Sequence, residues 1–319
     1  MKANTIIRRF GRFAACVAML AAAACTGNFE DYNTKPFRPS DDDLNGDNVG
    51  VGILFPAMME FVTHFQVNAS QMHDVLVADE LGGYTSAVKS YQGQNIATYN
   101  PSDKFNDYIF EQTFANFYGN YFKVETQTGG EGPVYQLARI LRVAAMLRVT
   151  DAYGPIPYSK LESNESVYVE YDSQEAVYTK MFEELDEAIE ILGRNTTLPA
   201  EAWSRYDGVY YGNIAQWLKY ANSLKLRMAM RLSYVKSDVA RAKAAAAIAG
   251  GVIEANADNA AMHAAENRTT LIYNDWGDHR VGADILCYMN GYKDPRMEKM
   301  FLANDVGDYV GIRIGIDVT

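Results

Sequence analysis

The chain has 319 residues, enough to bury the core of one large domain or two ordinary ones, and its apolar fraction of 48% is that of a globular protein. Its formal net charge is −11, and removal of residues 1–24, with four basic and no acidic residues, would lower that charge to −15. A surface this acidic argues against a nucleic-acid partner and against electrostatic docking on anionic lipid.

Residues 1–24 have the features of a secretory signal peptide, a basic head followed by an apolar run too short to span a bilayer. Small residues precede Cys25, which predicts a lipoprotein signal in which Cys25 becomes the lipidated first residue. A plain secretory signal with an incidental cysteine is the alternative. Cys16 leaves with the signal and Cys25 is acylated, so Cys287 remains alone. We therefore expect no disulfide and no cysteine-based zinc site.

Residues 25–50 are polar and acidic, and we interpret them as the lipidated N-terminus and a tether to the body. Asp41, Asp43 and Asn45 match the first half of an EF-hand calcium loop. The twelfth position of that loop requires a bidentate Glu, and here it is Gly52. A solvated acidic linker is the favoured interpretation.

Residues 51–319 are predicted to form a mainly α-helical domain, because apolar residues recur there at helical spacing. Asp172 and Glu175 form a capping-box pattern at the start of one helix, and Ser237 is the expected cap of another. The expected helices span residues 52–65, 104–124, 133–147, 172–193, 213–232, 237–250 and 289–301. Residues 306–319 alternate small and β-branched residues and are expected to be strand or extended chain.

Two long stretches, residues 81–101 and 256–282, lack helical periodicity and are rich in Tyr and in polar side chains. Such a mixture is typical of sugar-binding surfaces, because aromatic faces lie against the apolar faces of sugar rings while polar groups bind the hydroxyls. Tyr residues that only pack a surface loop are the alternative. The candidate ligand-binding residues are Tyr84, Tyr91, Tyr99, Tyr273, Trp276, Asp278 and Arg280.

The helix of residues 133–147 is followed by a sharp stop. Gly154 can adopt the left-handed conformation that closes a helix, and Pro155 and Pro157 cannot continue one. The chain should then leave as an extended arm that ends in Tyr158.

Four stretches, in chain order, resemble the SusD/RagB family of outer-membrane nutrient-binding lipoproteins. The first, Cys25 to Pro36, is similar to the lipidated start and its acidic surface signal. Asp151-Ala-Tyr-Gly-Pro-Ile-Pro-Tyr158 resembles the family's Asp-x-Tyr-Gly-x-x-Pro-Tyr hallmark. Trp217-Leu-Lys-Tyr-Ala-Asn-Ser-Leu-Lys-Leu-Arg227 resembles its Trp-x-x-x-Ala-Asn-Ser-Leu-x-x-Arg helix, and Asp294-Pro-Arg296 its late signature.

The resemblance implies a tetratricopeptide-like helical-repeat scaffold with long irregular loops. It implies a lipid-anchored protein of the outer membrane that faces the exterior and covers a SusC-like TonB-dependent transporter. The protein would capture an oligosaccharide, less often a peptide, and pass it to the transporter without chemistry. Family members continue well beyond Asp-Pro-Arg, so we expect the C-terminal part of the domain to be missing. By this resemblance the hallmark residues serve architecture and not ligand.

A glycan-active hydrolase and a helical-repeat adaptor are the remaining alternatives. Acidic residues are abundant enough to form pairs by chance, and no His-Glu-x-x-His or Gly-x-Ser-x-Gly motif is present. Glu60 with His64, and His73 with Asp74, could suggest a metal, but surface or capped histidines are favoured. We therefore predict no enzyme activity, no cofactor and no metal.

Overall fold

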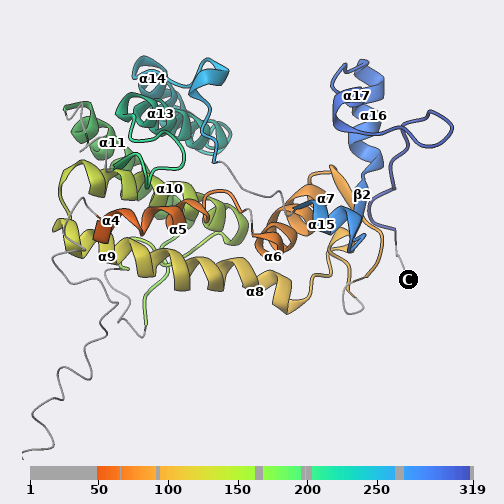
Figure 1. Ribbon diagram of the computed structural model, residues 1–319, viewed down its shortest axis with the longest axis horizontal. Helices are drawn as coiled ribbons and strands as arrows, with labels where there is room; N and C mark the ends of the chain where they lie inside the picture. Colours follow the sequence, from red (N-terminus) through yellow and green to blue (C-terminus); the bar gives the residue numbers. More distant parts are fainter. Residues whose placement is uncertain are drawn as a thin grey trace, which may run out of the picture. The chain divides into compact units, whose positions relative to one another are not determined.

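The predicted helix of residues 133–147 lies at the centre of the fold as α10 (Gly132–Tyr153), with Pro133 in its first turn. Side chains from Gln136 to Thr150 are buried on nearly every side of this helix, because α5, α9, α11 and α13 all pack against it. The computed structural model describes residues 49–64, 66–90, 94–161, 168–194, 198, 203–262 and 269–316. These residues belong to one compact unit, Asn48–Thr319 (Figure 1).

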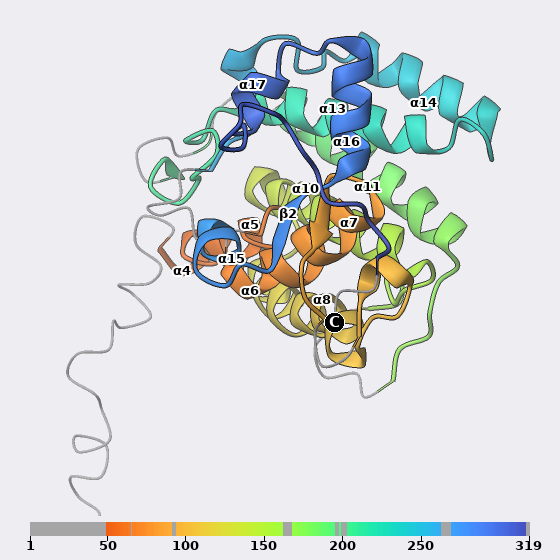
Figure 2. The same ribbon diagram turned by 90° about the vertical axis from the view of Figure 1, so that its right-hand side faces the viewer.

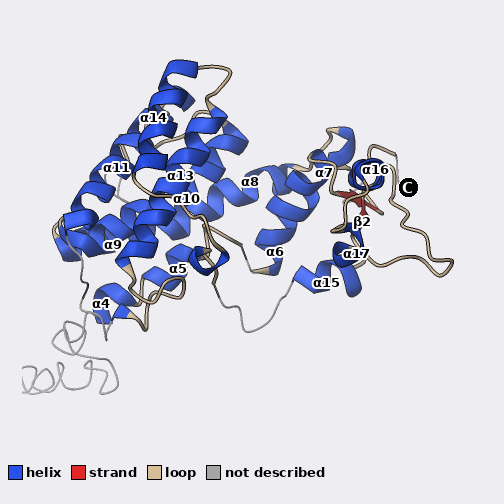
Figure 3. Cartoon of the chain, turned by 90° about the horizontal axis from the view of Figure 1, so that it is seen from above, coloured by secondary structure: helices blue, strands red, loops and turns tan. Residues whose placement is uncertain are grey.

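The described chain is mainly helical, as predicted (Figure 3). Its first part forms α4 (Val49–Gly52), α5 (Phe55–Met59), α6 (Val67–Ala69), the π-helix η2 (Ser70–Ala78), α7 (Asp79–Leu81), strand β1 (Thr85–Ala87), the 3₁₀-helix η3 (Ile96–Thr98), α8 (Asp103–Gln112), the π-helix η4 (Thr113–Phe117) and α9 (Tyr118–Thr128). After α10 follow α11 (Gln174–Arg194), α13 (Ile214–Arg231), α14 (Ser237–Ala249), the 3₁₀-helix η5 (Asn256–Asp258), α15 (Thr269–Asn274), strand β2 (His279–Val281), α16 (Ala283–Tyr292) and α17 (Met297–Met300).

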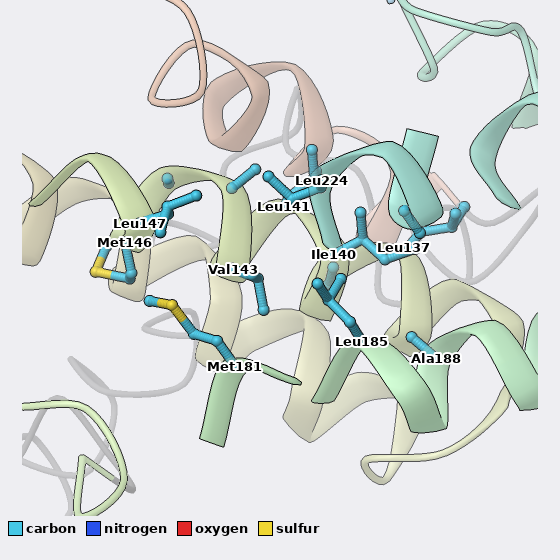
Figure 4. Packing of buried hydrophobic residues seen from close by; sticks show 14 of the residues in the cluster. Leu137, Ile140, Leu141, Val143, Met146, Leu147, Met181, Leu185, Ala188 and Leu224 are labelled. Carbon is cyan, nitrogen blue, oxygen red and sulfur yellow. The ribbon is translucent and has the colours of Figure 1, made fainter. Parts of the chain in front are cut away.

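The scaffold consists of tetratricopeptide-like helix pairs, in which α10 packs on α11, α11 on α13 and α13 on α14. The core between them is apolar and fully buried. Met146 of α10 and Met181 and Leu185 of α11 have no exposed surface, and Figure 4 shows these residues with Ile140 and Leu224 in the same cluster. None of the described helices combines the length and the apolar character that crossing a bilayer requires.

A second, smaller core lies beneath the irregular part of the chain. It joins Val67, Met72 and Leu76 of the α6–η2 segment to Phe105 of α8 and Ile272 of α15. Figure 2 shows α15 beside α6 and β2. This small core holds in place the loops that carry most of the candidate ligand-binding residues.

Three expected element boundaries are wrong. The helix expected over residues 52–65 is only α5, Phe55–Met59, followed by turns, and Pro56 lacks the amide that would bond back to Gly52 and join it to α4. Ser237 is the first residue of α14 and does not cap it; Lys236 occupies the cap position. The expected single helix of residues 289–301 is α16, which begins earlier, and α17.

Asp172 does not cap α11 as expected. Its carboxylate instead accepts hydrogen bonds from the amides of Tyr158 (3.2 Å) and Ser159 (2.6 Å) and from the Ser159 hydroxyl (2.8 Å). The cap is Ser173, whose hydroxyl accepts from the amide of Ala176 at 3.2 Å. The Asp172 carboxylate therefore binds the extended arm at Tyr158 and Ser159, and does not bind the first amides of α11.

Residues 306–316, the described part of the expected C-terminal strand, form no strand. Their one backbone bridge pairs Ile312 with Gly282 in parallel orientation. Residues 67–81 form the α6–η2–α7 helical segment, which the sequence analysis did not predict; its last residue, Leu81, was expected to begin a loop.

Candidate functional site

Two of the family-like stretches, Asp151–Tyr158 and Trp217–Arg227, contribute to the helical scaffold of the fold. Tyr158 is completely buried and donates its hydroxyl proton to Glu184 Oε2 at 2.6 Å. Asp151 accepts a hydrogen bond from the Tyr178 hydroxyl (2.5 Å) and pairs with Arg231 (2.9 Å), so it links three helices. Trp217 is buried, and its indole N–H donates to Asp207 at 2.7 Å.

A two-stranded antiparallel sheet brings the two irregular stretches together, although they are almost 200 residues apart in sequence. Thr85 of β1 pairs with Val281 of β2, and Ala87 pairs with His279. The amide of Gly282 then donates to the carbonyl of Tyr84 at 2.9 Å. Residues from both predicted sugar-contacting loops thus share one small sheet.

Helix α16 begins directly after this sheet and packs on the turn before β1. The amide of Ile285 donates to the carbonyl of Gly83 at 3.1 Å. Gly83 has φ +80°, and a Cβ at this position would lie 3.2 Å from Asp284 Cβ. Glycine is therefore required here both by backbone conformation and by close approach.

An open pocket of about 420 Å³ forms where this turn meets α16. Three tyrosine rings line it, Tyr84 from the turn and Tyr288 and Tyr292 from α16. All three are more than half exposed. The volume lies within the range of small-molecule sites, and aromatic walls with a few polar groups are typical of such sites.

Asp294 and Arg296 supply the charged groups of this pocket. The Arg296 guanidinium Nε lies 2.9 Å and 3.0 Å from the two Asp294 carboxylate oxygens, and its Nη2 also contacts Oδ2. Hydrogen bonds from the Arg296 side chain lower the pKa of Asp294 to about 2. Asp294 is therefore ionised at neutral pH, and the pocket presents a carboxylate acceptor beside a guanidinium donor.

Of the candidate residues predicted from the sequence, Tyr84 lines this pocket. Tyr273 and Arg280 instead contact each other, with the guanidinium carbon 4.5 Å from the ring centre. Trp276 is partly exposed, and its carbonyl accepts from Lys89 Nζ at 2.7 Å. Tyr99 is the residue that ends η3; its backbone is left-handed and its side chain is exposed to solvent.

Asp278 differs from the other candidates because its side chain is only 2% exposed. Its carboxylate pairs with Lys89 Nζ at 2.8 Å and accepts a hydrogen bond from Gln71. These contacts join the residue before β2 to Lys89 and to Gln71 of η2, so both carboxylate oxygens have partners within the protein. Tyr91 and Cys25 lie outside the described residues.

The sequence reasoning missed Tyr288 and Tyr292, and with them Asp284, which also lines the pocket. These three residues follow one another at intervals of four, the spacing of one helix face. The signal was present in the sequence, but the helix was expected to begin at Met289, so Tyr288 lay outside it. Asp294 and Arg296, interpreted from the sequence as architectural, also line the pocket.

His64, His73 and Asp74 come together, as a metal site would require. Arg148 already lies among them: its Nη2 is 2.9 Å from His73 Nδ1 and 3.5 Å from His64 Nδ1, and it also contacts Asp74. Burial, and then the Arg148 charge, lower the pKa of His64 to about 4. Burial raises the pKa of Asp74, but the His73 hydrogen bond and the Arg148 charge outweigh it and lower this pKa. The cluster is a partly buried ion-pair network built around a guanidinium, and His64 is its one buried member.

Comparison with protein families gives a match over residues 31–319 to the family described as SusD-like, Susd and RagB outer membrane lipoprotein. Comparison with curated proteins gives no significant match.

Several solved structures are similar to this chain. A SusD homologue from Bacteroides thetaiotaomicron is 41% identical with a TM-score of 0.76, over 83% of this chain and 56% of that one. A SusD homologue from Bacteroides ovatus is 38% identical with a TM-score of 0.75, over 83% and 57% of the two chains. A chitin-binding SusD homologue from Flavobacterium johnsoniae is 31% identical with a TM-score of 0.77, over 84% and 57%. The present chain thus spans little more than half the length of these proteins.

Proposed function

We propose that this chain, which belongs to the SusD-like family of outer membrane lipoproteins, binds oligosaccharides in the pocket between Tyr84 and α16. The observation that carries the proposal is the set of three exposed tyrosine rings around one carboxylate–guanidinium pair. Sugar rings present C–H groups of slight positive charge on their faces, which suit the negative face of an aromatic ring. The sugar hydroxyls need both acceptors and donors, which Asp294 and Arg296 provide.

The identity of the sugar is suggested only by similarity. One similar protein is described as chitin-binding, so chito-oligosaccharides are the first ligands to test. Xylo-, malto- and manno-oligosaccharides extend the panel, and peptides represent the alternative ligand class.

Calorimetry on the wild-type chain and on single variants tests this site. We expect Tyr288→Ala and Tyr292→Ala each to weaken oligosaccharide binding by about fivefold, since one aromatic contact contributes about 1 kcal/mol. Both rings are largely exposed, so neither substitution should disturb folding. Tyr234→Ala is the matched control, because Tyr234 is fully exposed and does not line the pocket. Unchanged affinity in all pocket variants would place the ligand elsewhere, and binding of peptides alone would replace the glycan proposal.

The proposed role includes no catalysis. A glycosidase needs a carboxylic acid with a raised pKa as its general acid, and the pKa of Asp294 is instead lowered. Oligosaccharides incubated with the protein should remain intact by mass spectrometry. Cleavage that is lost in Asp284→Asn or Asp294→Asn would show that the pocket is catalytic.

Anchoring and delivery complete the proposal. Lipidation at Cys25 would hold the protein on the exterior face of the outer membrane, where it would pass its ligand to a SusC-like TonB-dependent transporter. Cys25→Ala should release the protein from membranes, and retention with an unchanged lipid label would contradict this anchor. Affinity purification from intact outer membranes should recover the transporter together with this chain.

A further inference from the structure

The candidate pocket contains a carboxylate, that of Asp284, which forms no ion pair or hydrogen bond with the described residues. Asp284 lines the pocket from the first turn of α16, and it is exposed. It does not cap its own helix, because the cap position belongs to Gly282 and no side-chain bond is made there. Its charge interacts favourably with the helix dipole, but this interaction leaves both carboxylate oxygens available to a ligand.

The backbone holds Asp284 beside the turn that carries Tyr84. The amide of Ile285 donates to the carbonyl of Gly83 at 3.1 Å. A Cβ at Gly83 would lie only 3.2 Å from Asp284 Cβ, so the turn and the first turn of α16 are in close contact. Tyr84 follows Gly83 directly, and its ring lines the same pocket. The carboxylate and this ring are therefore neighbours in the pocket wall.

Helix α16 adds two more rings to the same face. Asp284, Tyr288 and Tyr292 recur at intervals of four residues, and each interval corresponds to a rise of about 6 Å along the helix. The two tyrosines are 70% and 82% exposed, so most of each side chain is accessible to a ligand. The helix thus presents a row of one carboxylate and two rings, with Tyr84 beside it.

The charges that line the pocket do not cancel. Arg296 pairs with Asp294, since its Nε lies 2.9 Å and 3.0 Å from the two carboxylate oxygens. These two groups neutralise each other, and Asp284 adds a further negative charge, so the lining carries −2 + 1 = −1. The faces of the tyrosine rings are also negative and attract cations. The spare carboxylate and the rings therefore favour the same sign of ligand charge.

We propose that this pocket selects oligosaccharides that carry a protonated amine, which are amino sugars of the glucosamine type. The inference rests on the function proposed above and names the class of sugar. The ammonium group donates to Asp284 and contacts the face of a neighbouring tyrosine ring, while the rest of the sugar packs on the other rings. Uronates, which carry a carboxylate, are disfavoured because their charge has the same sign as that of the pocket.

Calorimetry with sugars of equal length and linkage tests this selectivity. The β-1,4-linked tetramer of glucosamine and cellotetraose differ at C2, where one has an amine and the other a hydroxyl. At about pH 6 and low salt we expect the wild type to bind the amino sugar about 5 to 30 times more tightly, which corresponds to one exposed ion pair and one cation–π contact. About 0.5 M NaCl should reduce this preference by screening. Tetragalacturonate should bind most weakly of the three.

Two substitutions of Asp284 test its role. Asp284→Asn keeps the shape but removes the charge, and it should lower the ratio of the two affinities by about two- to fivefold. Asp284→Lys changes the charge of the lining from −1 to +1 and should make tetragalacturonate bind more tightly than the glucosamine tetramer. Asp103→Asn is the matched control, because Asp103 is an exposed carboxylate in the first turn of α8 that does not line the pocket. Thermal unfolding of each variant verifies that it is folded.

The outcomes separate this inference from the proposed function. If cellotetraose binds as tightly as the glucosamine tetramer, or if Asp284→Asn keeps the full preference, selection by Asp284 is refuted while sugar binding stands. Tightest binding of tetragalacturonate by the wild type would refute it in the same way. If none of the sugars binds at any concentration tested, the proposed function fails, and the inference fails with it.

Discussion

Arg142 of α10 and Glu184 of α11 form a buried ion pair, with Nη1 3.0 Å from Oε1. The second Glu184 oxygen accepts from the Tyr158 hydroxyl at 2.6 Å, and Arg142 Nη2 donates to the Tyr158 carbonyl at 2.7 Å. The guanidinium also lies over the Tyr158 ring, 4.2 Å from its centre. The last residue of the hallmark arm is thus the third member of a closed network that joins two core helices.

Substitution of one partner of this pair should be strongly destabilising. Glu184→Gln leaves the Arg142 charge buried and unpaired, for which we expect a loss of about 3–5 kcal/mol in the free energy of unfolding. Glu183→Gln is the control. Glu183 Oε2 lies 3.3 Å from Lys180 Nζ, both side chains are exposed, and exposed ion pairs contribute about 0–1 kcal/mol to stability. Urea unfolding measures both variants. A similar, small loss in both would show that the buried pair does not stabilise the fold.

Gly154, which ends α10, has φ +77° and ψ −117°, a conformation that residues with a side chain rarely adopt. A Cβ would meet no atom within 4 Å, so the cost of Gly154→Ala comes from backbone strain alone. We expect a loss of about 1–3 kcal/mol. Gly193→Ala is the control, since Gly193 lies in α11, where alanine also meets no atom and should be neutral or stabilising by about 0.4–1 kcal/mol. Equal stabilities of the two variants would contradict the assignment of strain to Gly154.

Asp172 is expected to matter more than the residue that caps α11. Asp172→Ala removes three hydrogen bonds to the arm at Tyr158 and Ser159 and leaves two buried or part-buried amides without this acceptor. The expected loss is about 2–3 kcal/mol. Ser173→Ala removes one capping bond and should cost about 1 kcal/mol. Chemical unfolding measures the free energy of unfolding of both variants. A greater loss in Ser173→Ala than in Asp172→Ala would contradict this prediction.

His64 should make the stability depend on pH in a defined window. Its folded pKa is about 4 and its unfolded value is about 6.5, so below pH 6.5 the unfolded chain binds a proton that the folded chain excludes. The contribution is fully present above pH 6.5 and is lost as the pH falls toward 4, by about 3 kcal/mol in all.

Unfolding of wild type and His64→Gln from pH 7.5 to pH 4.5 measures this contribution. The difference between the two chains is the useful quantity, because burial raises the pKa of Asp79 to about 6 and of Glu80 to about 7, and these groups act in the opposite direction. The wild type should lose stability relative to His64→Gln as the pH falls. Parallel curves would mean that His64 is not buried in its neutral form.

The sequence by itself determined the helical scaffold, because helical periodicity is a local property. The apolar spacing at Leu137, Ile140 and Leu141 predicted α10, and the same reasoning predicted α11 and α13 to within one or two residues. The stop at Gly154 followed from the conformations that glycine and proline allow. Two of the motifs that indicated the family, Asp151–Tyr158 and Trp217–Arg227, lie at the end of α10 and within α13.

Only the tertiary structure decided where the candidate site lies. Strands β1 and β2 have three residues each, too few to give a periodic signal, and their pairing depends on a contact across almost 200 residues. That contact, with α16 docked on Gly83, carries Tyr288 and Tyr292 to Tyr84. For Asp278 the local pattern was misleading. A polar residue in a polar loop is expected to be exposed, but the tertiary structure buries Asp278 and pairs it with Lys89. Local pattern identifies which residues favour a helix or a loop, whereas burial and proximity depend on which distant segments share a surface.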